Sequence, residues 1–212
     1  MASVSGTTLV DRVLPARSPS RFTALLRDGV LVLGFSAFMA LCARFSIYIP
    51  WITPVPITLQ TLGVLLTGAV LGSRRGALAL LAYLAEGALG LPVFAGGSGG
   101  VAVLLGYTGG YLWSYPLAAW VTGWLCERGL DRRYLTAALA MLPGSLIIYA
   151  VGVPWLALVL HLGPAQALLL GMAPFLVGDT LKLLLAAALL PSAWLVLRLG
   201  PQRDQGAPSR SR

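Results

Sequence analysis

Long apolar stretches dominate this sequence, and short segments that contain arginine separate them. A helix needs about 20 mainly apolar residues to cross the hydrocarbon core of a bilayer. Stretches of roughly this kind run over residues 29–47, 57–71, 77–94, 108–125, 134–160 and 174–197. Only 10% of the residues are charged, whereas soluble domains carry about 25%. The sequence therefore predicts an all-α integral membrane protein with six transmembrane helices.

The basic residues predict how these helices are oriented. With six spans, all of the Lys and Arg residues except Arg44 and Lys182 fall on one side of the membrane. They precede the first span or follow the second, fourth and sixth spans. Of the basic residues, the other side then has only Arg44 and His161. Cytoplasmic loops are enriched in Lys and Arg, so both termini are predicted to be cytoplasmic (N-in/C-in) in a cell membrane. The net charge of +8 then reflects topology, and nucleic acid is not expected as a partner. The residues concerned are Arg12, Arg17, Arg21, Arg27, Arg74, Arg75, Arg128, Arg132, Arg133, Arg198, Arg203, Arg210 and Arg212.

One membrane domain is predicted over residues 29–198, between cytoplasmic tails at 1–28 and 199–212, the first of them disordered at its start. A cleaved signal peptide is not expected, because no short apolar segment with a small-residue cleavage site precedes the first span. Cys42 and Cys126 fall in predicted spans and are expected to act as small apolar residues. We find no disulfide, metal or cofactor motif in their spacing.

Three segments are predicted to face outward together. Residues 44–61 are rich in proline and aromatics and therefore stiff. Residues 92–112 are rich in glycine, which lets backbone approach a ligand closely. The third segment is 161–174, in which the short apolar stretch 163–173 is expected to form an interfacial or re-entrant helix. Non-helical backbone is tolerated at membrane depth only where it is buried in protein or lines a cavity. We expect the three segments to converge over a pocket, with Tyr48, Trp51, Phe94 and Tyr107 as ligand contacts.

Asp179 and Lys182 lie in the outer part of the last predicted span. Inserting a charge at the centre of a bilayer costs roughly 2.5–3.5 kcal/mol on insertion scales. Residues three apart share a helix face, so the pair is either a structural ion pair or part of a binding site. An ionisable residue inside a membrane is by default a functional candidate. Glu86, within the third span, is expected to be structural.

Ser36 and Ala40 form a stripe of small residues on the first span. Such a stripe allows close contact between helices, either within the chain or with a partner membrane protein. The sequence carries no ATP-binding motif, so any ATP-driven transport would need another chain.

Four motifs in order point to a family: PVPITLQTLGVLLTGAVLG (54–72), GLPVFAGGSGG (90–100), TGGYL (108–112) and PFLVGDTLK (174–182). Together they resemble the BioY family, the substrate-binding S components of energy-coupling factor transporters. The resemblance implies an S-component fold that binds biotin in an outward-facing pocket. It implies that Asp179 and Lys182 contact the vitamin, and that the partners are two cytoplasmic ATPases and a transmembrane coupling protein docking on Ser36 and Ala40. The family pattern often has proline where this chain has Tyr107.

Biotin offers a cyclic urea, an apolar thioether ring and a carboxylate tail. Asp179 can accept from a urea N–H, while Lys182 can donate to the urea carbonyl or to the tail. Arg44, the Gly96–Gly97 backbone and Thr108 are further candidates, the first two for the carboxylate. Which end of biotin the Asp–Lys pair holds stays open. An S component for another vitamin or a stand-alone carrier is the alternative; an enzyme is not expected, because no nucleophile–base or metal set is present.

Overall fold

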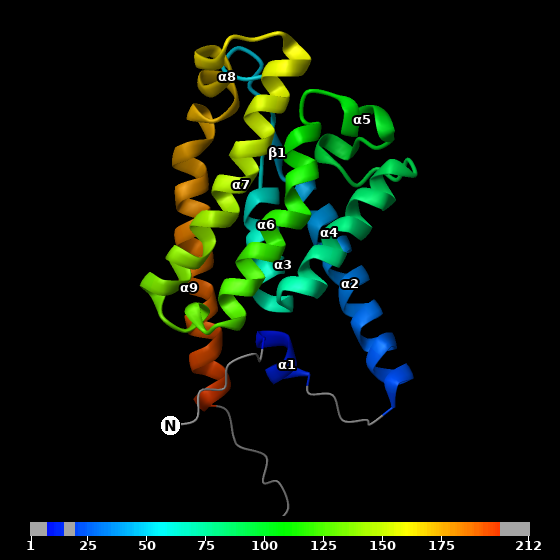
Figure 1. Ribbon diagram of the computed structural model, residues 1–212, viewed down its shortest axis with the longest axis vertical. Coiled ribbons are helices and arrows are strands. Elements are labelled where there is room, and N and C mark those ends of the chain that lie inside the picture. The colour runs from blue at the N-terminus through cyan, green and yellow to red at the C-terminus, as the bar shows by residue number, and fades with distance from the viewer. Residues whose placement is uncertain (1–7, 15–19, 200–212) are drawn as a thin grey trace, which may run out of the picture.

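The computed structural model describes residues 8–14 and 20–199, apart from the side chains of residues 198 and 199. Residues 1–7, 15–19 and 200–212 of the predicted tails lie outside the described residues, and so do Arg17, Arg203, Arg210 and Arg212. The described part is mainly helical (Figure 1). Its longer helices are α2 (Arg21–Arg44), α3 (Gln60–Leu71), α4 (Ser73–Ala88), α6 (Gly109–Glu127), α7 (Tyr134–Leu160) and α9 (Leu176–Leu199).

Short elements join these helices. The helices α1 (Leu9–Val13), α5 (Val101–Leu105) and α8 (Pro164–Gly171) are short, and 3₁₀ turns lie at Ala95–Gly97, Leu130–Arg132 and Ala173–Phe175. Strands β1 (Ser46–Ile47) and β2 (Ile57–Thr58) pair antiparallel, with Ser46 opposite Thr58. This pairing closes the proline-rich stretch between them into a loop.

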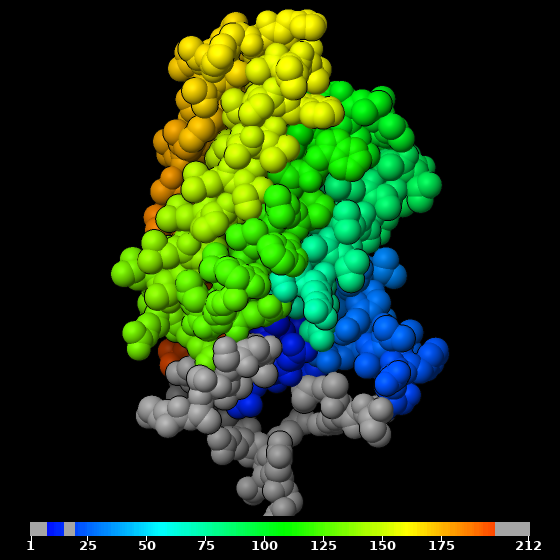
Figure 2. All heavy atoms as spheres, in the orientation of Figure 1, coloured from blue at the N-terminus to red at the C-terminus, as the bar shows by residue number. Residues whose placement is uncertain are grey.

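Helix α6 forms the centre of the bundle and packs against α7, α3 and α4. Glycine makes the closest approach possible. A Cβ on Gly68 of α3 would lie 2.3 Å from the backbone oxygen of Ala119 on α6, a separation that real side chains do not tolerate. In Figure 2, atoms of α4, α6 and α7 lie side by side over the face of the molecule that is in view. Helices α3 and α6 are therefore in direct backbone-to-backbone contact at this point of the core.

The two ends of the bundle differ in character (Figure 1). One end, called here the α8 end, carries α5, α8 and the loop between β1 and β2. The other, the α1 end, carries α1, the start of α2 and the end of α9. At the α1 end, Asp11 accepts from Arg27 at 2.9 Å and from Arg75 at 2.8 Å, and Arg75 also pairs with Asp28. These ion pairs hold α1 under the bundle.

Several helix bounds differ from those predicted. Helix α2 begins at Arg21 instead of near Gly29, and α4 ends at Ala88, which leaves 89–94 irregular. Helix α7 is continuous through Pro143 and Pro154, where the prolines predicted interruptions. Helix α3 has 12 residues and is therefore about 18 Å long, shorter than a hydrocarbon core of about 30 Å. At the α8 end, the chain enters α3 through β2 and the loop between β1 and β2.

Membrane-spanning capacity is clearest in three parts of the described chain. Judged by length and composition alone, Arg21–Arg44, Tyr134–Leu160 and Pro164–Leu197 are long and apolar enough to cross a membrane. Gln60–Leu71 is apolar but shorter. The predicted short helix at 163–173 is present as α8, and it continues through a 3₁₀ turn into α9.

Candidate ligand-binding site

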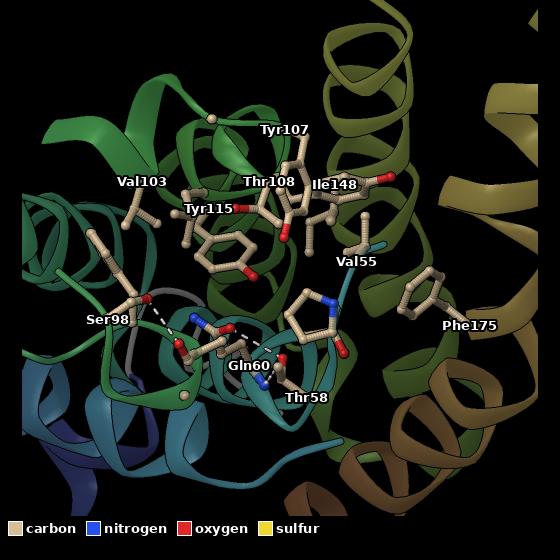
Figure 3. A pocket seen from close by; sticks show the side chains of 18 of the residues that line it. Val55, Thr58, Gln60, Ser98, Val103, Tyr107, Thr108, Tyr115, Ile148 and Phe175 are labelled. Atoms are coloured by element: carbon tan, nitrogen blue, oxygen red, sulfur yellow. Dashed lines mark hydrogen bonds between the residues drawn. The ribbon is translucent and has the colours of Figure 1, made fainter. Parts of the chain in front are cut away.

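A cavity of about 470 Å³ opens at the α8 end of the bundle (Figure 3). Its lining comes from α3, α5, α6, α7 and α9, from the loop between β1 and β2, and from the segment Gly90–Gly100, called here the Gly-rich segment. Pockets for small ligands commonly measure roughly 300–1,000 Å³. Two of the three segments predicted to converge, 44–61 and 92–112, supply lining residues, whereas residues 161–174 supply none.

Asp179 and Lys182 both line this cavity from the first turns of α9. Lys182 Nζ lies 2.7 Å from Asp179 Oδ1, and their side chains are only 13% and 11% exposed. The i, i+3 spacing places both groups on the same side of the helix. The pair is thus largely shielded from solvent, as its position in the sequence suggested.

Every donor of Lys182 has a partner in this structure. An ammonium has three N–H donors. Lys182 Nζ donates to Asp179 Oδ1 at 2.7 Å, to the backbone oxygen of Thr58 at 2.7 Å and to Thr61 Oγ1 at 3.2 Å. Lys182 therefore joins α9 to the start of α3, and it can donate to a ligand only by releasing one of these acceptors.

The carboxylate of Asp179 is held from two other helices. Thr61 Oγ1 on α3 donates to Oδ1 at 2.9 Å, and the Tyr149 hydroxyl on α7 donates to Oδ2. Oδ1 thus accepts two hydrogen bonds, while Oδ2 accepts one and keeps a lone pair. The arrangement offers a ligand one carboxylate acceptor beside a neutralised charge, which suits an N–H donor.

Sequence reasoning missed Tyr149 and Thr61. Tyr149 lies 30 positions from Asp179 and Thr61 lies 118 positions away. Thr61 belongs to the PVPITLQT stretch of the first motif, but nothing in that stretch predicted a hydrogen bond to Asp179. Tyr149 lies in a uniformly apolar span, and its polar hydroxyl there was the one available signal.

The predicted aromatic contacts divide into two groups. Tyr48, Phe94 and Tyr107 line the cavity, whereas Trp51 is 85% exposed and is not among the lining residues. Further aromatic lining comes from Tyr111, Tyr115, Tyr149 and Phe175, and Figure 3 shows Tyr107, Tyr115 and Ile148 gathered in one region of the cavity. Trp51 was misassigned because proximity in the loop does not fix the direction of its side chain.

The Gly-rich segment meets the cavity through Phe94, Ala95, Gly96 and Ser98. Gly96 and Gly97 have φ angles of 67° and 75°, a left-handed conformation that favours glycine. A Cβ on Gly96 would also lie 2.7 Å from the Tyr48 hydroxyl. Burial raises the pKa of Tyr48 above its usual value, so its hydroxyl keeps its proton at neutral pH. Gly97 itself is not among the lining residues.

Arg44 is exposed and does not line the cavity. Its Nη2 donates to the backbone oxygen of Pro92 at 3.0 Å, and a Cβ on Gly97 would lie 2.9 Å from its Nη1. Arg44 therefore supports the Gly-rich segment from outside. Thr108, by contrast, lines the cavity at the start of α6, as predicted.

The small-residue stripe on α2 is turned into the bundle at one of its two positions. Ser36 is fully buried and donates to Glu86 Oε2 on α4 at 2.5 Å. Ala40 is partly buried against the core. This agrees with a structural role for Glu86, and it means that the Ser36 side chain is not on the surface of this chain.

Ligands for a metal are not gathered anywhere in the described residues. Within 8–14 and 20–199, no group of three or more His, Cys, Asp or Glu side chains is placed to hold an ion. Cys42 and Cys126 are both buried as free thiols. The chemistry of the cavity is thus that of one ion pair, hydroxyl and amide groups, and aromatic rings.

Comparison with known proteins gives these features a family context. The model of the BioY family matches residues 14–199. This chain belongs to the BioY family. It is 41% identical over 170 residues to the biotin transporter BioY of Rhizobium etli, covering 77% of this chain and 90% of that protein. It is 45% identical over 152 residues to the probable biotin transporter BioY of Pyrococcus horikoshii, covering 72% and 86%.

A solved structure has the same architecture as this BioY family member. The crystal structure of the S component for biotin from an ECF-type ABC transporter superimposes with a TM-score of 0.75 at 25% identity. The match covers 85% of this chain and 95% of that one. The S-component fold predicted from the four motifs is therefore confirmed.

Proposed function

We propose that this protein is the biotin-binding subunit of a transporter that takes biotin up across the cell membrane. Membership of the BioY family, close similarity to biotin transporters and the fold of a biotin S component support this function. The observation that carries it in the chain's own residues is the buried Asp179–Lys182 pair lining the cavity. Binding and release of the vitamin, without chemical change to it, is the activity of such a subunit.

The urea of biotin binds at Asp179 in this proposal. The Asp–Lys pair is neutral as a whole and all three Lys182 donors are engaged, so it attracts a carboxylate weakly. The remaining Oδ2 lone pair of Asp179 suits one urea N–H, and charge-assisted bonds of this kind are strong. Tyr107, Tyr111, Tyr115 and Phe175 supply surface for the thioether ring. The carboxylate tail then extends toward the Gly-rich segment, where Tyr48 and the Gly96 backbone lie.

Six spans with both termini in the cytoplasm form the membrane arrangement that we propose. The α1 end carries Arg27 and Arg75, together with Arg74 at the start of α4. Arg44 lies toward the α8 end. This asymmetry follows the positive-inside rule. The cavity then opens to the outside of the cell, from which biotin is captured. The short helices α3 and α4 span together with the loops that continue them.

Energy for uptake would come from partner chains, because the sequence contains no ATP-binding motif. We propose two cytoplasmic ATPases and a transmembrane coupling protein, as in ECF-type ABC transporters. Docking would involve α2 near Ala40, with Ser36 acting from inside through its bond to Glu86. Exposed apolar side chains on α2, among them Leu25, Leu26 and Val30, provide surface for such a partner.

Calorimetric titration of the purified protein tests the function. We expect wild type to bind biotin, and thiamine and riboflavin to give no signal. Asp179→Asn should weaken biotin binding at least about 100-fold, because a charge-assisted bond and the orientation of Lys182 are both lost. The matched control is Asp28→Asn at the α1 end, which should bind as wild type does. Equal binding by wild type and Asp179→Asn would remove Asp179 from the site.

Uptake assays test the partners. Cells that express this chain with its ATPases and coupling protein should accumulate labelled biotin in an ATP-dependent way that a protonophore does not abolish. Accumulation by this chain alone, without ATP, would instead identify a stand-alone carrier.

A further inference from the structure

Gln60 and Tyr83 form a buried polar chain beside the Asp179–Lys182 pair. Gln60 begins α3, lines the cavity and is 3% exposed. Tyr83 lies on α4, is fully buried and is not a lining residue. Gln60 Nε2 donates to the Tyr83 hydroxyl at 2.7 Å, and that hydroxyl donates to the backbone oxygen of Val93 at 3.0 Å. These hydrogen bonds connect the cavity wall to the Gly-rich segment.

The hydrogen bonds from Gln60 to Tyr83 and from Tyr83 to Val93 fix which way the amide of Gln60 faces. A tyrosine hydroxyl has one proton, and that of Tyr83 goes to Val93. The Tyr83 oxygen can therefore only accept from Gln60, which must present its nitrogen there. At the other end of the amide, Gln60 Oε1 accepts from Thr58 Oγ1 at 3.2 Å. The Thr58 hydroxyl could pair with either end of the amide, so the orientation is fixed at Tyr83, whose one proton is used by Val93.

One donor and one acceptor of Gln60 remain. A carboxamide has two N–H donors and two acceptor lone pairs, and one of each is used. Within the part of the chain that the structure describes, the second N–H and the second lone pair have no partner. Buried polar groups are almost always hydrogen-bonded. A ligand that brings an acceptor and a donor side by side would complete this amide.

We propose that Gln60 recognises the N–H and C=O edge of a cyclic urea, and that Tyr83 is the positioning residue that orients it. The inference rests on the proposed function. A cyclic urea has N–H groups on both sides of its carbonyl, so one edge pairs with Gln60 while the other N–H reaches Asp179. Thr58 links the two positions, because its Oγ1 bonds Gln60 and its backbone oxygen accepts from Lys182.

Tyr83 also holds the start of the Gly-rich segment, which lines the cavity. Its ring meets that of Phe94 edge to face, with centroids 5.4 Å apart and planes at 82°. Phe94 lines the cavity, and Val93 beside it accepts the Tyr83 hydrogen bond. Figure 3 shows Gln60 drawn between Thr58 and Ser98 of the Gly-rich segment. One buried side chain thus orients the amide and holds the start of the segment.

A double-mutant cycle tests the pair. Tyr83→Phe removes the hydroxyl and keeps the ring, and Gln60→Leu removes the amide. We expect Tyr83→Phe to raise the Kd for biotin about tenfold, the worth of one or two oriented hydrogen bonds. In the Gln60→Leu background, the same substitution should change the Kd much less, because the amide that it orients is gone and only the bond to Val93 is lost. Thermal unfolding of each variant reports structural damage separately.

The outcomes separate the inference from the function. If wild type does not bind biotin, the proposed function fails first. If wild type binds and Tyr83→Phe weakens binding equally in both backgrounds, or not at all, the positioning role is overturned. Tyr134→Phe is the matched control, since Tyr134 begins α7, is 59% exposed, has its hydroxyl 3.5 Å from Ser192 Oγ on α9, and does not line the cavity.

Gln60→Glu provides a second test that does not depend on the cycle. A carboxylate accepts only, so this variant should favour a ligand edge with donors alone. In 2-iminobiotin the urea carbonyl is replaced by an imino group, which carries N–H donors when protonated. Relative to wild type, we expect the preference for biotin over 2-iminobiotin to fall at least about tenfold. An unchanged ratio would overturn direct recognition by Gln60.

Discussion

The two ends of the bundle each carry a carboxylate held by cations, in opposite surroundings. At the α8 end, Asp179 and Lys182 are 11% and 13% exposed, and neutral hydroxyls complete their hydrogen bonds. At the α1 end, Asp11, Arg27 and Arg75 are 20–27% exposed and form ion pairs near solvent. Solvent screens the second network, whereas burial strengthens the first and makes its unpaired members costly. Similar charges therefore line the cavity of the proposed binding site at one end and attach a helix at the other.

Lys182→Met should give the largest effect and sharpen this contrast. Removing one partner of a buried ion pair costs roughly 3–5 kcal/mol of stability, because Asp179 is left without its counter-charge. Thermal unfolding in detergent measures the loss. Adding Asp179→Asn should restore most of the stability and none of the biotin binding. A single variant as stable as wild type would show that the pair is solvated after all.

Tyr149→Phe probes the hydroxyl shell of the same pair. The substitution removes the donor to Asp179 Oδ2 and leaves the ring in place. We expect biotin to bind about 10- to 150-fold more weakly, the range for a hydrogen bond to a charged group. Titration calorimetry measures it, with Tyr134→Phe as control. Tighter binding would mean instead that Tyr149 competes with the ligand for that oxygen.

Arg44→Ala tests whether Arg44 holds the ligand or only the Gly-rich segment. Loss of its bond to Pro92 should speed release of biotin and of biotin methyl ester alike, by a few-fold, as expected for one exposed hydrogen bond. Dissociation rates of the two ligands provide the comparison. A loss confined to biotin would assign Arg44 to the carboxylate.

Asp11→Asn should have the smallest effect. Burial alone would raise the pKa of Asp11, but hydrogen bonds from Thr8, Arg75 and Arg27 hold it below its usual value. Its contribution is therefore complete above about pH 4 and is lost as the pH falls through the lower folded-state pKa. At pH 7 we expect a loss of stability of up to about 1 kcal/mol that disappears in strong acid, and unchanged biotin binding. Altered binding would mean that the two ends are coupled.

Much of the fold follows from the sequence because hydropathy and arginine placement are local properties. Apolar stretches predicted the long helices, and the short stretch after Gly163 predicted α8. The bounds were less certain where glycine and proline occur. Pro143 and Pro154 lie inside α7, and proline is tolerated within membrane helices more readily than in soluble ones.

The candidate site was predictable only in part. Asp179 and Lys182 could be paired from the sequence because residues three positions apart on a helix share a face. Arg44 and Trp51 were expected at the ligand because they lie in the correct segment, yet neither lines the cavity. A loop's sequence does not fix side-chain direction, which depends on whether a distant backbone, such as Pro92, offers a partner.

The sequence by itself determined that this chain is a helical membrane protein of the BioY type with a charged pair near one end of its last helix. The tertiary structure decided what surrounds that pair. Thr61, Tyr149, Gln60 and Tyr83 come from three other helices, and they meet because α6 packs closely enough to bring α3, α4 and α7 together. Contacts between residues far apart in the chain depend on this packing, and local sequence does not encode them one residue at a time.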